Sequence, residues 1–233
     1  MIYKKNKLTI DSFNIDFLAK KFKTPIYCYS FKKLKENILN FKKNFQKINP
    51  LICFAVKSNT NIKILAEIKK FNLGADVVSA GELMKALKVG INPKKIVFSG
   101  VGKTASEIEY AINNKILLIN AESKSEILEI EKIAKQKKRV VNIGIRLNPN
   151  TDAKTISQIS TGKKENKFGV DEKEFLNLVE YVKDSKVINL KCLSVHIGSQ
   201  ILNHKPYEKM LAVVDKIIKK SKYSFEYIDL GGG

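Results

Sequence analysis

From residue 51 onward, short apolar runs rich in β-branched residues alternate with amphipathic stretches. The amphipathic stretches carry apolar residues at i, i+3 and i+4, the spacing that predicts a helix with one buried face. We expect seven strands, within residues 51–57, 74–79, 95–100, 116–121, 140–148, 190–198 and 225–233. Helices are expected between them, including residues 61–71, 80–90, 106–114 and 124–136. This alternation predicts a parallel α/β sheet, either a closed barrel or an open doubly wound sheet.

Two further stretches complete the pattern. Residues 25–30 (PIYCYS) are expected to form another strand, followed by a helix at residues 31–45. Residues 151–169 form a long polar segment that is expected to be a loop. A long loop inside a compact domain is usually functional or mobile. We therefore expect an N-terminal strand and helix, then the α/β unit with one functional loop.

The two faces of each predicted strand differ, because side chains alternate between faces. In residues 140–148 the apolar face carries Val141, Ile143, Ile145 and Leu147, and the other carries Asn142, Gly144, Arg146 and Asn148. The apolar face suits packing against helices, and the small, polar face suits a barrel interior. Near the carboxyl ends of five strands this second face carries Lys57, Asp76, Arg146, His196 and Asp229. Parallel α/β folds bind ligands at that end, which predicts one shared site.

Lys57 and the three glycines at residues 231–233 suggest a specific cofactor. A lysine such as Lys57, buried beside other cations, would become a nucleophile toward a carbonyl group. Gly231, Gly232 and Gly233 follow the last predicted strand, where bare backbone N–H groups can bind a phosphate. An aldehyde-reactive lysine together with a phosphate site is the combination that pyridoxal phosphate requires.

A nucleotide motif competes with this interpretation. Residues 100–105 fit the pattern G-x-G-x-x-A after a strand, and Glu122 lies about 20 residues further on, as a dinucleotide site requires. The match is weak, because a turn glycine is expected in any strand-to-helix connection. The same stretch contains GKT, but the first glycine of a phosphate-binding loop would fall on Val97, so that motif fails.

The formal net charge of +20 raises the question of nucleic acid. Lys and Arg total 43, but Arg139 and Arg146 are the only arginines, and nucleic-acid sites favour arginine. The lysines are spread along the whole chain, without an RNA-binding sheet motif. We therefore expect a solvated lysine surface and no nucleic-acid partner. Salt-dependent binding to nucleic acid would support the alternative.

Cysteine usage and hydropathy restrict the compartment. Cys28, Cys53 and Cys192 make no disulfide framework, which favours a reducing environment. The N-terminus lacks the apolar core of a signal peptide, and no apolar run approaches the roughly 18 residues of a membrane helix. The histidines and cysteines show no metal-ligand spacing. We expect a cytoplasmic protein with no membrane partner and no metal.

Seven motifs resemble the diaminopimelate decarboxylase family, which belongs to the alanine-racemase-like, fold type III pyridoxal-phosphate enzymes. They are FAVKSN (54–59), GADVVSAGEL (74–83), VFSGVGKT (97–104), RLNPN (146–150), ISTGKKENKFG (159–169), HIGSQ (196–200) and DLGGG (229–233). The motifs span nearly the whole chain in the family's order. FAVK and the glycine cluster are shared with ornithine and arginine decarboxylases. ISTG…KFG together with HIGSQ is more specific to the diaminopimelate branch.

The resemblance implies a (β/α)8 TIM-type barrel that removes CO2 from meso-2,6-diaminopimelate to give L-lysine, the last step of lysine biosynthesis. Lys57 would form a Schiff base with pyridoxal phosphate, and His196 would stack on its ring, so these two are the expected catalytic residues. Asp76 and Arg146 would form part of the polar network around the ring. The phosphate would be held by Ser199, Gly231, Gly232 and Gly233. Residues 159–169 would lie over the site.

The resemblance also implies that part of the enzyme is missing. Residues 1–50 would lead into a barrel at residues 51–233 that has about seven of its eight strands, and the family's C-terminal β-domain is absent. We therefore expect an inactive fragment of an enzyme that is a homodimer at full length. Two alternatives stay open: a related decarboxylase acting on ornithine, arginine or carboxynorspermidine, and a non-catalytic pyridoxal-phosphate carrier.

Overall fold

A computed structural model gives the fold and describes residues 2–4, 6–151 and 168–232. Seven parallel strands form one curved sheet in the order β10-β9-β8-β7-β6-β5-β4. The strands are β4 (Cys53–Ala55), β5 (Gly74–Val77), β6 (Ile96–Phe98), β7 (Leu118–Ala121), β8 (Val141–Leu147), β9 (Ile188–Val195) and β10 (Tyr227–Asp229). Each strand therefore neighbours its predecessor in the chain, the connectivity of a barrel. The predicted fold class, an incomplete TIM-type barrel with seven strands, is confirmed.

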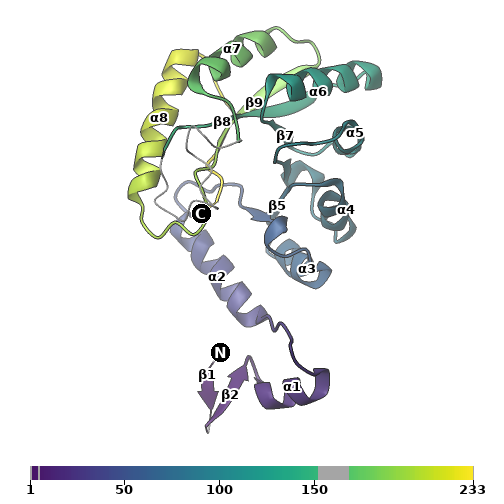
Figure 1. The fold of residues 1–233 in the computed structure, drawn as a ribbon, viewed down its shortest axis with the longest axis vertical. Coiled ribbons are helices and arrows are strands. Elements are labelled where there is room, and N and C mark those ends of the chain that lie inside the picture. The colour runs from purple at the N-terminus through teal and green to yellow at the C-terminus, as the bar shows by residue number, and fades with distance from the viewer. Residues whose placement is uncertain (1, 5, 152–167, 233) are drawn as a thin grey trace.

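Six helices lie on the outer face of this sheet (Figure 1). They are α3 (Ile62–Lys70), α4 (Ala80–Lys88), α5 (Ala105–Asn113), α6 (Lys124–Lys137), α7 (Glu172–Lys183) and α8 (Lys205–Ser221). Three of them begin with a hydroxyl cap. The side chains of Ser79, Thr104 and Ser123 each accept a hydrogen bond from the backbone N–H of a glutamate three residues later. Such caps stabilise the helix start by about 1 kcal/mol each, and they fix where the chain leaves the carboxyl end of the strand.

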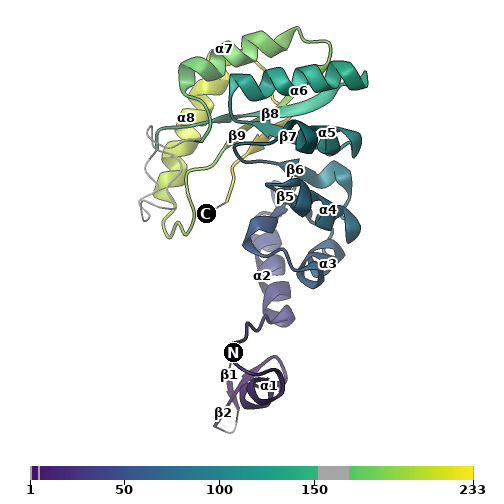
Figure 2. The ribbon, with the colours of Figure 1, turned by 45° about the vertical axis from the view of Figure 1, so that its right-hand side comes forward.

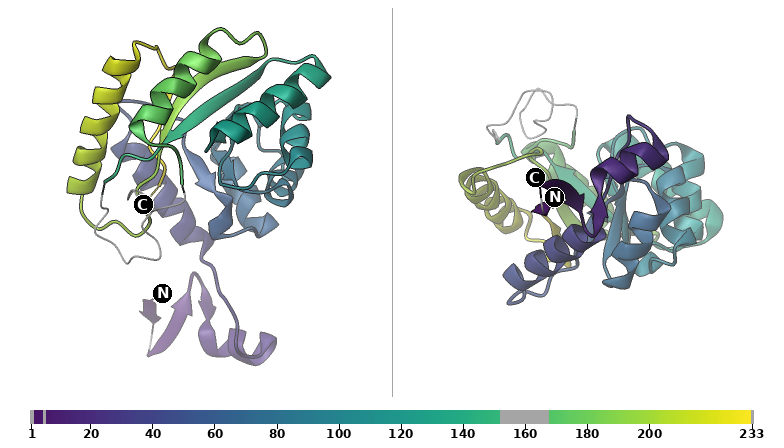
Figure 3. Two further views of the ribbon diagram at one scale, coloured as in Figure 1. Left: turned by 45° about the horizontal axis from the view of Figure 1, so that its top comes forward. Right: turned by 90° about the horizontal axis from the view of Figure 1, so that it is seen from below.

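The barrel has two apolar layers. The outer layer lies between sheet and helices, where Ile143, Ile145 and Leu193 pack with Phe175 and other helix residues. The inner layer contains side chains from several strands of the curved sheet, namely Cys53, Val97, Leu118, Cys192 and Tyr227. Figure 3 shows the sheet curling around this interior with the helices outside it. The predicted assignment of one strand face to the helices and the other to the interior is therefore confirmed.

The N-terminal region has more structure than the sequence predicted. A small antiparallel sheet of β1 (Ile2–Lys4), β2 (Lys7–Ile10) and β3 (Phe13–Asn14) precedes α1 (Ile15–Phe22). Residues 23–30 then lead into α2 (Phe31–Asn44), which matches the predicted helix. Figures 1 and 2 show the small sheet and α1 beyond the start of α2, away from the barrel.

The strand predicted at residues 25–30 does not form. Tyr27 in the middle of the segment is 92% exposed, and no described strand pairs with it. An alternating apolar pattern indicates which side chains could be buried. A strand also needs a neighbouring strand that accepts and donates its backbone hydrogen bonds. Elsewhere, no helix among the described residues is both long and apolar enough to cross a membrane.

Candidate active site

The five ionisable groups predicted at the carboxyl ends of the strands lie together in the structure. The positive charges of Lys57 and Arg146 act on both Asp76 and His196, and the charge of Asp229 acts on the same two groups. They come from the ends of β5, β8 and β10 and from the residues just after β4 and β9. This end of the barrel therefore brings two cations, two carboxylates and an imidazole within electrostatic reach of one another.

Arg146 is buried and held by a second buried residue, Glu122. Its Nη1 lies 2.9 Å from Glu122 Oε1, and its guanidinium lies over the ring of Phe168 at 4.8 Å. Glu122 also accepts from the backbone N–H groups of Gly100 (3.1 Å) and Gly169 (3.0 Å). The other guanidinium nitrogen, Nη2, is buried without a hydrogen-bond partner among the described residues. A fixed guanidinium with one unused donor is suited to an acceptor atom of a ligand.

Glu122 has a structural role that the weak dinucleotide pattern does not describe. Its carboxylate binds the guanidinium of Arg146 and the backbone N–H of Gly100, so that both of these contacts are made within the protein. Lys103 of the same motif is also internal, because its Nζ lies 2.6 Å from Gly100 O, 2.8 Å from Asn120 O and 2.6 Å from Glu126 Oε1. The lysine is thus used to join two strand-to-helix connections, and the dinucleotide interpretation has no support in the geometry.

The two carboxylates belong to a hydrogen-bonded layer across the barrel interior. Ser99 Oγ donates to Asp76 Oδ1 (2.6 Å), and Asn120 Nδ2 donates to Ser99 Oγ (3.2 Å) and to Asp229 Oδ2 (2.8 Å). Ser194 Oγ donates to the same Asp229 oxygen (3.1 Å). Burial, with a smaller contribution from the charge of Asp229, raises the pKa of Asp76 to about 6.

Sequence reasoning missed Ser99, Asn120 and Ser194 as members of this layer. Their signal was the same alternation that identified the ionisable groups, since polar residues on an inward face near the carboxyl end point at the same space. Which of them would meet could not be deduced, because that depends on how the curved sheet brings distant strands face to face.

His196 and the glycine turn after β10 are in direct contact. Gly231 has a φ of +67°, and a Cβ added there would lie 2.7 Å from His196 Nδ1. The backbone N–H of Gly232 donates to His196 Nδ1 (3.3 Å), and that of Gly231 donates to Asp229 Oδ1 (2.9 Å). Burial, reinforced by the nearby charges of Arg146 and Lys57, lowers the pKa of His196 to about 4. The imidazole is therefore neutral near pH 7 and presents a flat, uncharged aromatic ring.

Lys57 differs from expectation in its burial. β4 ends at Ala55, and the chain turns into a short 3-10 helix, η1 (Val56–Ser58), which places Lys57 at the mouth of the barrel, where it is exposed. Ser199 lies in the bend after β9, half-buried, three residues beyond His196. Gly233 and residues 152–167, which include most of the loop predicted to cover the site, lie outside the described residues.

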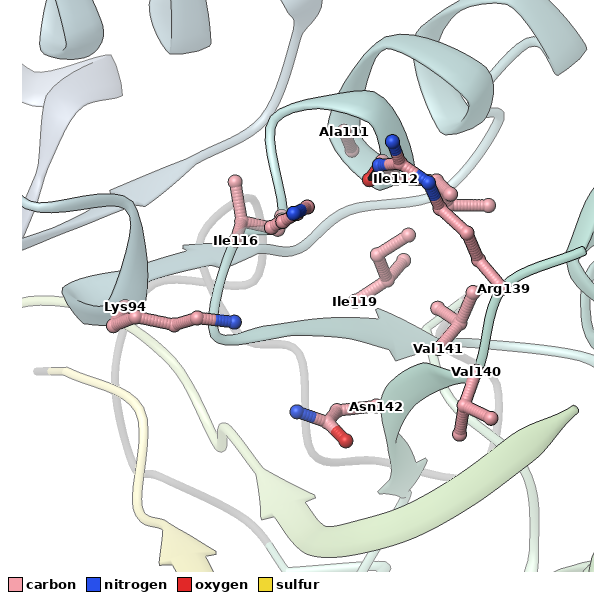
Figure 4. A pocket seen from close by; sticks show the side chains of 10 residues that line it. Lys94, Ala111, Ile112, Ile116, Ile119, Arg139, Val140, Val141 and Asn142 are labelled. Carbon is pink, nitrogen blue, oxygen red and sulfur yellow. Dashed lines mark hydrogen bonds between the residues drawn. The ribbon is translucent and has the colours of Figure 1, made fainter. Parts of the chain in front are cut away.

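A hollow of about 320 Å³ lies at the opposite end of the barrel. Figure 4 shows Lys94 and Arg139 on either side of it, with Ile119 and Val141 between them. The guanidinium of Arg139 donates to the backbone oxygens of Ile112 (3.0 Å) and Asn113 at the end of α5 (3.2 Å). Because its lining comes from the amino ends of β7 and β8, the hollow is separate from the cluster of ionisable groups.

Three comparisons with known proteins agree. A curated diaminopimelate decarboxylase of Helicobacter pylori strain J99 is 46% identical over 224 residues, 95% of this chain and 55% of its own length. The crystal structure of a Helicobacter pylori diaminopimelate decarboxylase complexed with L-lysine superposes with a TM-score of 0.86 at 47% identity, over 89% of this chain and 52% of that one. The M. jannaschii enzyme in co-complex with L-lysine gives 0.90 at 33%, over 99% and 56%.

The chain thus spans about half the length of the curated relatives it matches. A family described as "Pyridoxal-dependent decarboxylase, pyridoxal binding domain" matches residues 31–233, which is most of the chain and includes every strand of the curved sheet. The chain therefore belongs to the pyridoxal-dependent decarboxylases and contains their pyridoxal-binding domain.

Proposed function

We propose that this protein binds pyridoxal 5'-phosphate at the carboxyl ends of its barrel strands and decarboxylates meso-2,6-diaminopimelate to L-lysine and CO2. The observation that carries the proposal is the grouping of Lys57, Arg146, His196 and the Gly231 turn at one end of the barrel. The substrate is inferred from relatives named diaminopimelate decarboxylase at up to 46% identity. In this proposal, residues 1–50 lead into the barrel and residues 51–233 form the cofactor-binding barrel.

The residues present fit the cofactor in three respects. The amine of Lys57 stands at the exposed mouth, where an aldehyde can reach it. The buried Nη2 of Arg146 has an unused donor for an oxygen on the ring. Open space lies where a Cβ of Gly232 would be, so that a phosphate can approach the main chain there, while the N–H groups of Gly231 and Gly232 donate to Asp229 and His196 in this structure.

Each residue then has a specific task. Lys57 would bind the aldehyde covalently, and the neutral ring of His196 would pack against the cofactor ring. Asp76 and Arg146 would supply polar contacts around it. Ser199 with Gly231, Gly232 and Gly233 would hold the phosphate. Pyridoxal phosphate, when bound, supplies an electron-withdrawing ring that stabilises the electron pair left on the α-carbon as CO2 departs.

The site residues select the reaction by orientation. Of the bonds at the α-carbon, the one that breaks is the one held perpendicular to the ring, so the groups that fix the ring and the substrate decide the product. A buried arginine with a locked guanidinium is a rigid reference point for that orientation. We further propose that the protein works in the cytoplasm as a homodimer.

The proposal is tested with purified protein, produced as its gene encodes it and supplied with pyridoxal phosphate. CO2 release is measured with meso-diaminopimelate, ornithine, arginine and carboxynorspermidine, with Lys57→Ala as the matched control. We expect release from meso-diaminopimelate with formation of L-lysine by protein of its relatives' length, none from its Lys57→Ala variant, and none from residues 1–233 alone. Preference for another of these substrates would identify a related decarboxylase. Cofactor binding without CO2 release from any of them would identify a carrier.

A further inference from the structure

Asn120 and Asp229 form a contact that connects the barrel interior to the glycine turn. We propose that these two are positioning residues, whose hydrogen bond holds the turn at Gly231 and Gly232 in the conformation that binds the cofactor phosphate. The inference rests on the proposed function, because the phosphate is that of pyridoxal phosphate. It adds Asn120 to the site and gives Asp229, which the strand pattern already placed there, a specific role.

The carboxylate of Asp229 accepts hydrogen bonds from three donors. Its Oδ2 accepts from Asn120 Nδ2 (2.8 Å) and Ser194 Oγ (3.1 Å), and its Oδ1 accepts from the backbone N–H of Gly231 (2.9 Å). Two donors from the barrel therefore fix the orientation of the carboxylate, and the carboxylate fixes the first N–H of the turn. These donors also offset a negative charge that would otherwise repel a phosphate bound nearby.

Asn120 is held just as firmly. It is 1% exposed, and the second hydrogen of its amide goes to Ser99 Oγ. Its Oδ1 lies where a side chain on β8 would be, since a Cβ added to Gly144 would come within 2.2 Å of that oxygen. The glycine in β8 thus makes room for the asparagine, and the asparagine has one orientation in which both of its N–H groups are used.

The contact matters because β10 has few other constraints. β10 is three residues long and pairs with β9 on one side, at the edge of the sheet in the described residues. Asn120 comes from β7, which is separated from β10 in the sheet by β8 and β9, so the hydrogen bond crosses the barrel interior. It links the edge strand to the middle of the sheet, and the turn that follows β10 is joined to the same carboxylate.

The second glycine of the turn is held by contacts that do not involve Asp229. Gly232 donates to His196 Nδ1, and its oxygen accepts from the hydroxyl of Tyr207 on α8 (3.1 Å). If Asp229 lost its orientation, Gly231 would lose its hydrogen bond while Gly232 kept both of its contacts. The expected defect is therefore local to the phosphate end of the cofactor.

The test compares pyridoxal phosphate with pyridoxal, which lacks the phosphate. The equilibrium dissociation constants of pyridoxal and of pyridoxal phosphate are measured on the protein as its gene encodes it. The ratio of the constant for pyridoxal to the constant for pyridoxal phosphate reports the phosphate contribution. Asn120→Leu and Asp229→Asn should each lower that ratio about tenfold, the usual effect of losing a hydrogen bond to a charged group. The double variant Asn120→Asp with Asp229→Asn exchanges donor and acceptor and should restore the ratio to within about threefold.

The matched control is Asn142→Leu, which removes another interior asparagine, at the start of β8, whose amide donates to Leu117 O. It should lower stability while leaving the ratio unchanged. If Asn120→Leu does not fold, the nearly isosteric Asn120→Asp alone gives the answer, because it removes the donor to Asp229. Equal losses of affinity for both ligands, or no change in the ratio, would overturn the inference. Wild-type protein that binds neither ligand would overturn the proposed function, and that result is seen before any variant is made.

Discussion

Gly231 packs directly on His196, with no space between them for a side chain. A Cβ on Gly231 would lie 2.7 Å from His196 Nδ1 and 2.8 Å from Val195 O, and the backbone at Gly231 has a φ of +67°. The neighbouring Gly232 has open space where its Cβ would be. Of these two consecutive glycines, Gly231 has a steric reason to be glycine and Gly232 has none among the described residues, and the difference can be measured.

We predict that Gly231→Ala lowers the free energy of unfolding by about 1 to 3 kcal/mol, through left-handed backbone strain and displacement of His196. Gly232→Ala is the matched control and should change it by less than about 0.5 kcal/mol. Urea denaturation of the cofactor-free variants gives both values. Equal effects of the two substitutions would show that Gly231 does not pack as described.

Lys103 provides a second prediction, on stability. Its side chain is 1% exposed and binds Glu126 together with two backbone oxygens, so that its removal leaves a buried carboxylate unpaired. We expect Lys103→Met to cost about 3 kcal/mol of unfolding free energy. Lys132, which pairs with Glu129 on the exposed face of α6, serves as the control, and Lys132→Met should cost less than about 0.5 kcal/mol. If the two variants were equally stable, Lys103 would not have the structural role assigned to it.

The raised pKa of Asp76 predicts a dependence of stability on pH. With a pKa of about 6 in the folded protein against an ordinary value of 3.8, the folded state binds more protons between these values than the unfolded state. Ionisation of Asp76 therefore lowers stability as the pH rises from about 4 to 6, and the full cost is present above pH 6. Asp76→Asn removes this cost. Relative to wild type, the cofactor-free variant should gain about 2 kcal/mol between pH 4 and pH 7.

Denaturation at both pH values measures this change. Asp215→Asn, on the exposed face of α8, controls for loss of a carboxylate elsewhere. His196 changes stability in the opposite direction over the same pH range. Because its pKa is lowered to about 4, its contribution to stability rises as the pH increases. A difference between Asp76→Asn and wild type that stays constant with pH would contradict the burial of Asp76.

The order and faces of the strands could be predicted because both follow from local pattern. Apolar runs gave the seven strands, and alternation placed Asp76, Arg146 and Asp229 on the interior face. Parallel strands end at a common edge, so these groups had to lie near one another. The same reasoning predicted a strand at residues 25–30 and was wrong there, because an apolar pattern alone does not supply a neighbouring strand.

The partners within the site could not be predicted, because they depend on curvature. Asn120 and Asp229 are far apart in the sequence and meet only when the sheet curls. Glu122 fits a dinucleotide pattern by spacing, and only the fold reveals that Arg146 is opposite it. The exposure of Lys57 likewise depends on the turn into η1, which an extended strand pattern does not show.

The central claim is that Lys57, among all the lysines of this chain, carries the cofactor. The most direct measurement is reduction of the cofactor-loaded protein with borohydride, followed by peptide mapping of the trapped pyridoxyl group. The account predicts one adduct, on Lys57, and none in the Lys57→Arg variant. An adduct mapped to another lysine, such as Lys103, or one retained in Lys57→Arg would contradict it.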